Sequence, residues 1–128
     1  KILVVSDTHG HDENLMRVLQ REWPIDALIH CGDLEGSEDY IPEAVECPCF
    51  FVRGNNDFFS DLPKEEVFSL ENYRIMVTHG HMYGVSLSTC QLEEEARRRR
   101  GGSDSFKSGQ SFLPAPAGTK TELSCYAN

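Results

Sequence analysis

Residues 1–10 have the sequence KILVVSDTHG, an apolar run that passes directly into a polar turn. The segment Lys1–Val5 predicts a buried strand, because it is short, mostly apolar and bounded by a turn. Beyond the turn, Leu15, Val18 and Leu19 follow the i, i+3, i+4 spacing of a helix with one apolar face. A buried strand followed by such a helix is typical of an α/β protein.

The same alternation continues along the first half of the chain. Further strands are predicted at Ala27–His30 and Cys49–Val52, with a weaker helix between them at Glu38–Val45. Glu66–Leu70 and Tyr73–Thr78 predict an antiparallel hairpin. Because strands alternate with helices before the hairpin, the sequence predicts an α/β fold whose first strands are parallel.

A last helix is predicted at Leu87–Arg100, and Gly101 and Gly102 are expected to end it. Three Glu–Arg pairs on this helix have the favourable i, i+4 order: Glu93–Arg97, Glu94–Arg98 and Glu95–Arg99. The composition changes after the helix, because 13 of the 28 residues in 101–128 are Gly, Ser, Pro or Thr. We therefore expect a single domain spanning 1–128, in which residues 101–128 form an atypical tail.

The charge of the chain limits its partners. Twelve basic and 21 acidic residues give a net charge of −9, so the overall field attracts neither nucleic acid nor an anionic membrane. The sequence contains no apolar run of 18 residues and no signal-peptide pattern.

Its five cysteines include no CxxC pair, which disfavours zinc ribbons and redox pairs and favours reduced thiols. We expect a cytoplasmic protein.

Polar residues follow four of the predicted strands. In α/β sheets, ligands bind beyond the carboxyl ends of the strands. Carboxylate and imidazole groups together suit manganese, iron, zinc or nickel, and a carboxylate can bridge two ions. Any one of these residues alone is more typical of a turn or a helix cap, but the combined set favours a metal site. Its members are Asp7, His9, His30, Gly32, Asp33, Gly54, Asn55, Asp57, His79, Gly80 and His81.

Four of these segments resemble, in order, the motifs of the calcineurin-like metallophosphoesterases, and the short YfcE-type phosphodiesterases in particular. The segments are SDTHG at 6–10, GD at 32–33, GNND at 54–57 and THGH at 78–81. The resemblance covers residues 1 to about 100. It implies a two-layer α/β sandwich of mixed β-sheets flanked by helices. It also implies a metal-dependent phosphoesterase, more specifically a phosphodiesterase, acting on a small-molecule phosphoester.

The resemblance also assigns roles to single residues. Asp7 and His9 would bind the first of two divalent ions, Asn55 and His79 the second, and Asp33 both. Manganese is the expected metal, with nickel, zinc, iron and magnesium as alternatives. A metal-bound hydroxide would attack phosphorus, so Asp33 and Asn55 also belong to the catalytic set. The other candidate catalytic residues are His81, as a substrate contact, and Asn56.

The sequence departs from the family at two points. Asn56 stands where many relatives have a histidine, and Asn cannot deliver a proton to a leaving group. The family's late Gly-His-x-His motif has no counterpart, since no histidine follows His81. A frameshift or splice after Arg100, a sequence that records only part of a longer protein, or a true variant site would each explain this.

Losing one histidine ligand per ion predicts weak or absent hydrolysis by this chain, because even the loss of groups that support the ligands costs 10–100-fold. The alternative function is a non-catalytic metal-binding scaffold or interaction module of the same fold. One retromer subunit resembles this fold and serves mainly as a scaffold, and a fold by itself does not fix a function. The five matching ligands Asp7, His9, Asp33, Asn55 and His79 favour the enzyme, because clustered carboxylates repel one another without a metal.

Overall fold

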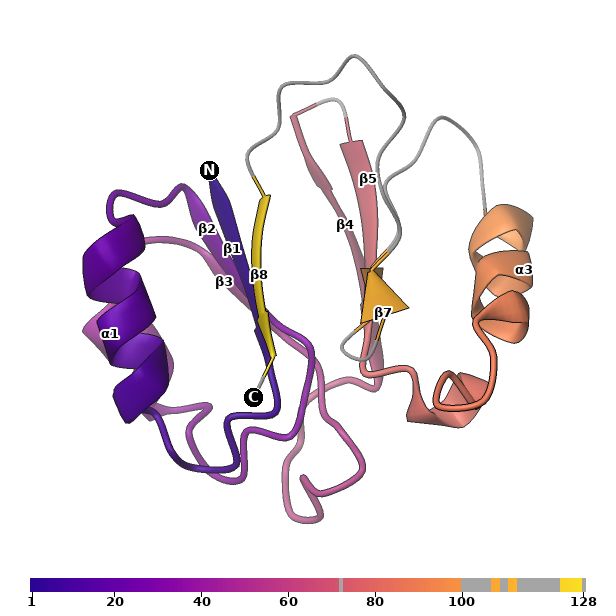
Figure 1. Cartoon of the computed structure of the whole chain (residues 1–128), viewed down its shortest axis with the longest axis horizontal. Coiled ribbons are helices and arrows are strands. Elements are labelled where there is room, and N and C mark those ends of the chain that lie inside the picture. The colour runs from indigo at the N-terminus through magenta and orange to yellow at the C-terminus, as the bar shows by residue number, and fades with distance from the viewer. Residues whose placement is uncertain (72, 100–106, 109–110, 113–122, 128) are drawn as a thin grey trace.

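The computed structural model describes residues 1–71, 73–99, 107–108, 111–112 and 123–127, and it confirms the predicted alternation of strands and helices (Figure 1). None of the helices in these ranges is long and apolar enough to cross a membrane. The elements are β1 (Ile2–Ser6), α1 (Glu13–Glu22), β2 (Ala27–His30), α2 (Tyr40–Ala44), β3 (Cys49–Phe51), β4 (Glu65–Leu70), β5 (Tyr73–Thr78), the 3-10 helix η1 (His81–Tyr83), α3 (Cys90–Arg98), β6 (Lys107–Ser108), β7 (Ser111–Phe112) and β8 (Leu123–Ala127).

The first sheet has the order β3-β2-β1-β8, and all its neighbouring strands are parallel. Leu3 in β1 pairs with Leu28 in β2, and both side chains are fully buried. They belong to one apolar cluster with Leu15 and Leu19, the buried face of α1. The predicted helical spacing therefore places α1 against the outer face of this sheet (Figure 1).

The second sheet has the order β4-β5-β6-β7 and is mixed. The predicted hairpin of β4 and β5 is confirmed, whereas β5 and β6 run parallel. The two sheets pack through Val4, Ile29 and Val77, and through Phe50 and Phe68, whose rings stack at 3.8 Å between centroids. The fold is therefore the expected two-layer sandwich with helices outside it, with one sheet parallel and one mixed (Figure 1).

Helix α3 differs from its prediction. It begins three residues later, because Leu87 donates its backbone N–H to Gly84 in a turn and is exposed. The predicted Glu94–Arg98 pair is wrong, since Arg98 pairs with Glu95 at 2.6 Å, three residues before it. The Glu93–Arg97 and Glu95–Arg99 pairs form, and the exposed arginine of the first makes its contribution to stability small. The helix ends at Arg98, with Arg99 as its C-cap, which is two residues before the predicted last residue, Arg100; Gly101 and Gly102 lie outside the described residues.

Candidate metal centre

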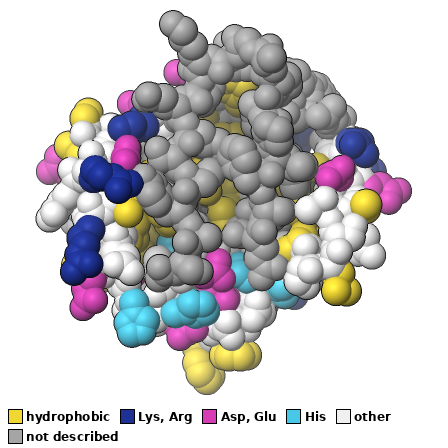
Figure 2. Space-filling model, viewed as in Figure 1, with side chains coloured by type: hydrophobic (Ala, Val, Ile, Leu, Met, Phe, Trp, Pro, Cys, Tyr) yellow, Lys and Arg dark blue, Asp and Glu magenta, His cyan; other side chains and the backbone are white. Residues whose placement is uncertain are grey.

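The loops that follow β1 and β2 run side by side. Three backbone hydrogen bonds join them: Asp7 N–H to Gly32 O at 3.0 Å, His9 N–H to Asp33 O at 2.9 Å, and Gly10 N–H to Leu34 O at 3.0 Å. Asp7 and His9 thereby lie next to Asp33 at the carboxyl ends of two neighbouring strands, as the parallel sheet predicts. Figure 2 shows histidine and acidic side chains gathered at this edge of the molecule.

The backbone of these loops is strained. Among the described residues, five other than glycine have positive φ, and four of them lie here: Asp7 (58°), His9 (49°), Asp33 (57°) and Glu35 (52°). Such conformations cost of order 1 kcal/mol or more for each L residue, and they cluster at functional sites. The strain therefore marks this edge as a candidate functional site.

Glycine is required where the loop after β3 meets the loop after β2. A Cβ added to Gly54 would lie 1.9 Å from Asp33 Oδ1 and 2.6 Å from the Asp33 nitrogen. No side chain fits at that distance, so the missing Cβ lets the third loop approach Asp33. The loop after β3 therefore lies in direct contact with the loop after β2, although the two are about twenty residues apart in sequence.

Asp57 holds the same two loops together. Its Oδ2 accepts the backbone N–H groups of Asp33 and Gly54, each at 2.7 Å, and its Oδ1 accepts that of Glu35 at 2.7 Å. The residue is only 5% exposed, so these three hydrogen bonds replace the water that its carboxylate has lost. Asp57 belongs to the polar set that the sequence predicts, but its supporting role depends on contacts between loops that the sequence does not show.

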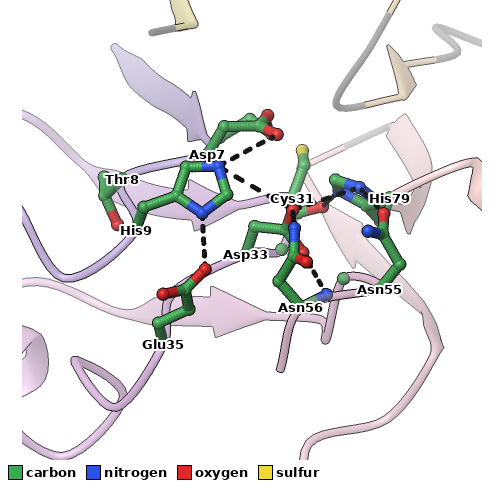
Figure 3. Close-up of polar contacts among 12 residues, drawn as sticks. Asp7, Thr8, His9, Cys31, Asp33, Glu35, Asn55, Asn56 and His79 are labelled. Atoms are coloured by element: carbon green, nitrogen blue, oxygen red, sulfur yellow. Dashed lines mark hydrogen bonds and ion pairs between the residues drawn. The ribbon is translucent and has the colours of Figure 1, made fainter. Parts of the chain in front are cut away.

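Asp7, His9 and Asp33 bring potential ligand atoms within 4.8 Å of one another. His9 Nε2 lies 4.0 Å from Asp7 Oδ1 and 3.9 Å from Asp33 Oδ2, which is too far for hydrogen bonds (Figure 3). His9 Nδ1 instead contacts Glu35 Oε1 at 2.6 Å, and this hydrogen bond raises the pKa of His9. The space between Nε2 and the two carboxylates suits a cation. We call Asp7, His9 and Asp33 the first half-site.

Asn55 and His79 lie on the other side of Asp33. His79 Nδ1 is 3.0 Å from the Cys31 carbonyl oxygen, and a neutral imidazole that donates this hydrogen bond keeps a lone pair on Nε2. That Nε2 faces Asn55 Oδ1 at 3.0 Å and Asp33 Oδ2 at 3.8 Å (Figure 3). We call Asp33, Asn55 and His79 the second half-site.

The second half-site fits a metal ion. Two lone pairs face each other between His79 Nε2 and Asn55 Oδ1, and a cation satisfies both. The 3.0 Å separation of these two atoms is short enough for both to serve one ion, so His79 and Asn55 would hold it. The residues present therefore fit the metal ions that the motifs predict.

The remaining candidates take different positions. Asn56 donates its backbone N–H to Asp33 Oδ1 at 2.9 Å and its side-chain amide to Asp33 Oδ2 at 2.6 Å, so it orients that carboxylate. His81 opens η1, with its ring centroid 5.3 Å from that of His79. Partial burial is the main cause that lowers the pKa of His81.

His30 supports the first loop from below. It is fully buried, accepts the Gly32 N–H on Nδ1 at 3.2 Å, and contacts Thr8 Oγ1 through Nε2 at 3.1 Å. Burial lowers the pKa of His30 to about 4. Folding therefore requires the neutral ring, so His30, which the sequence placed in the polar set, supports the loop as a structural residue.

Acid should destabilise the protein through His30. The unfolded chain protonates this histidine near pH 6.5 and the folded chain only near pH 4, so stability present above pH 6.5 falls as the pH drops towards 4. The contribution is about 3 kcal/mol. Urea unfolding in EDTA from pH 7 to 4 should show a steeper loss for the wild type than for His30→Gln. Parallel losses in the two proteins would show that His30 is not responsible.

Comparison with known proteins identifies the class. The family model described as the calcineurin-like phosphoesterase superfamily domain matches residues 1–111. The chain therefore belongs to this superfamily, as the four motifs predicted. The probable metallophosphoesterase YsnB of Bacillus subtilis is 41% identical over 85 residues, which is 66% of this chain and 48% of that protein. A probable metallophosphoesterase of Mycoplasma pneumoniae is 32% identical over 81 residues, 63% of this chain and 47% of that protein.

Solved structures agree with this assignment. A conserved uncharacterized protein from Streptococcus pneumoniae, described as a predicted phosphoesterase, superposes with a TM-score of 0.66 at 28% identity, covering 82% of this chain and 59% of that one. A single mutant of Vps29 from Entamoeba histolytica superposes with a TM-score of 0.52 at 23% identity, covering 72% of this chain and 58% of that one, and shows the fold alone. The chain spans about half the length of the curated relatives it matches.

Proposed function

We propose that this chain is a metal-dependent phosphodiesterase that acts on small-molecule phosphoesters and uses two divalent ions, with manganese as the preferred metal. One observation carries the proposal. Asp33 Oδ2 lies 3.9 Å from His9 Nε2 and 3.8 Å from His79 Nε2, so one carboxylate oxygen stands between the two half-sites. A carboxylate shared by two ions is the arrangement that two-metal phosphoester hydrolysis needs.

The donor set favours manganese. Two carboxylates, two imidazoles and one amide oxygen combine hard oxygen ligands with nitrogen ligands of intermediate softness. When bound, such ions lower the pKa of water to supply a nucleophile and neutralise charge on the phosphoryl oxygens. A phosphoester carries the negative charge that such ions attract, which the overall charge of −9 would otherwise repel.

The protein's own residues position these groups. Asn56 holds the Asp33 carboxylate through two hydrogen bonds and carries no transferable proton. His81, which lies beside the second half-site, contacts the substrate through a hydrogen bond. Because Asn56 cannot protonate a leaving group, the site favours esters whose leaving groups depart without protonation, such as aryl phosphodiesters.

Hydrolysis of an aryl phosphodiester tests the proposal. Metal-stripped protein should show turnover only after Mn²⁺ is added. This turnover should be slow, because each ion would have fewer histidine ligands than in relatives that carry the late Gly-His-x-His motif. His79→Gln should reduce this turnover more than about 100-fold, since it removes a ligand rather than a group supporting one. The exposed His11 serves as the matched control, and His11→Gln should retain the wild-type rate.

Other outcomes would point elsewhere. A rate that does not respond to Mn²⁺ would contradict the enzymatic proposal. If the protein binds Mn²⁺ and His79→Gln does not, while neither hydrolyses the ester, the non-catalytic metal-binding scaffold becomes the better account. Fast turnover by a chain carrying two ions would show that the expected weakness of the site is wrong.

A further inference from the structure

Glu35 makes a contact that the predicted ligand set does not include. Its Oε1 lies 2.6 Å from His9 Nδ1, while the other ring nitrogen, Nε2, faces Asp7 and Asp33 (Figure 3). The two nitrogens of the His9 ring therefore face different groups. Nδ1 lies at hydrogen-bond distance from the Glu35 carboxylate, whereas Nε2 points between Asp7 and Asp33 in the first half-site.

The proton position on His9 follows from this contact. A carboxylate accepts hydrogen bonds and does not donate them, so Nδ1 carries the hydrogen. A neutral imidazole has one N–H, and its lone pair then lies on Nε2, towards Asp7 and Asp33. Only this tautomer presents a metal ligand to the first half-site.

The backbone fixes Glu35 where this contact can form. Its N–H donates to Asp57 Oδ1 at 2.7 Å, and its φ of 52° is a strained value for a residue with a side chain. Strain of this kind persists where the surrounding structure imposes it, and here it aims the side chain back towards His9. The same Asp57 carboxylate also holds Asp33 and Gly54, so Glu35 belongs to the framework of the site.

From this geometry we propose that Glu35 is a positioning residue for the first half-site: it holds the His9 ring with Nδ1 protonated and Nε2 directed at the metal. The inference rests on the proposed metal centre. A histidine ligand commonly donates its second nitrogen to a carboxylate or carbonyl, and loss of that partner costs 10–100-fold in metal affinity. His79 uses the Cys31 carbonyl in this way, and His9 uses Glu35.

The effect of Glu35 is on orientation more than on charge. His9 and Glu35 have side chains that are 41% and 42% exposed, and exposed ion pairs are worth little to stability. We therefore expect removal of the carboxylate to leave folding almost unchanged and to weaken metal binding. If Glu35 served only as a surface acid, its removal would change neither folding nor metal binding.

Titration of the metal-stripped full chain with Mn²⁺ tests this role. Glu35→Ala keeps the Cβ and hence the backbone strain, and it should raise the Kd of the first half-site about 10–100-fold. Glu35→Gln retains an oxygen that accepts the Nδ1 hydrogen, so its Kd should lie between those of the wild type and Glu35→Ala. Glu43→Ala, on the exposed side of α2, is the matched control and should bind like the wild type.

A second readout needs no metal. Long-range ¹H–¹⁵N NMR at pH 8.5 reports which nitrogen of His9 carries the hydrogen. The wild type should show Nδ1–H, and Glu35→Ala should shift the population towards Nε2–H. An unchanged tautomer together with an unchanged Kd would overturn the role of Glu35. A wild type that binds no Mn²⁺ would contradict the proposed metal centre instead, and the tautomer would still decide whether Glu35 orients His9.

Discussion

Asp33→Asn is expected to remove tight binding of both metal ions and to abolish hydrolysis. Asp33 Oδ2 lies 3.9 Å from His9 Nε2 and 3.8 Å from His79 Nε2, so its charge serves both half-sites. An amide at this position supplies at most one neutral ligand oxygen and cannot bridge two cations as a carboxylate does. We expect Mn²⁺-dependent turnover to fall more than about 100-fold, beyond the loss from removing a group that only supports a ligand.

A matched control replaces an aspartate outside the metal centre with asparagine. Asp39, the exposed residue at the start of α2, makes no side-chain capping hydrogen bond, and Asp39→Asn should retain wild-type turnover. Thermal melting of both variants in EDTA checks that the fold is intact. Turnover by Asp33→Asn at the wild-type rate would mean that the reaction does not depend on a shared carboxylate.

Asp57→Ala is expected to cause the largest loss of stability. The change leaves the backbone N–H groups of Asp33, Glu35 and Gly54 without their acceptor. Each unsatisfied buried group costs about 1–3 kcal/mol, and hydrogen bonds to a charged acceptor lie at the upper end. A loss of several kcal/mol is a large part of the 5–15 kcal/mol that usually separates folded from unfolded states.

Urea unfolding in EDTA measures this loss apart from any effect on metal binding. Asp61→Ala changes an exposed aspartate in the same connection between β3 and β4, and its free energy of unfolding should stay within about 0.5 kcal/mol of the wild type. If the two alanine variants unfold at the same urea concentration, Asp57 does not hold the loops together.

Much of the fold was predictable because its signals are local. The apolar run of β1, the helical spacing of Leu15 and Leu19 and the two arms of the β4–β5 hairpin each fix an element without reference to the rest of the chain. The start of α3 was not predictable in this way. Gly84 has a φ of 61° in the turn that delays the helix, and the sequence alone does not show that this glycine takes that conformation.

The metal centre likewise contains residues that the sequence predicts and one that it does not. The strand ends and residue types predicted a polar metal-binding set, and the resemblance to the family motifs singled out its candidate ligands: Asp7, His9, Asp33, Asn55 and His79. Glu35 was missed, since an exposed glutamate in an acidic chain carries no pattern. Its significance comes from loop contacts and a positive φ, which depend on residues distant in sequence.

Calorimetric titration of the metal-stripped wild type with Mn²⁺, beside Asp33→Asn, tests the central claim most directly. We predict saturable binding by the wild type and affinity weaker by more than about 100-fold in the variant, because the shared carboxylate is itself a ligand and its loss should exceed that of a supporting group. Equal binding by the two proteins, or no binding by a folded wild type, would contradict the assignment of these loops as a metal centre.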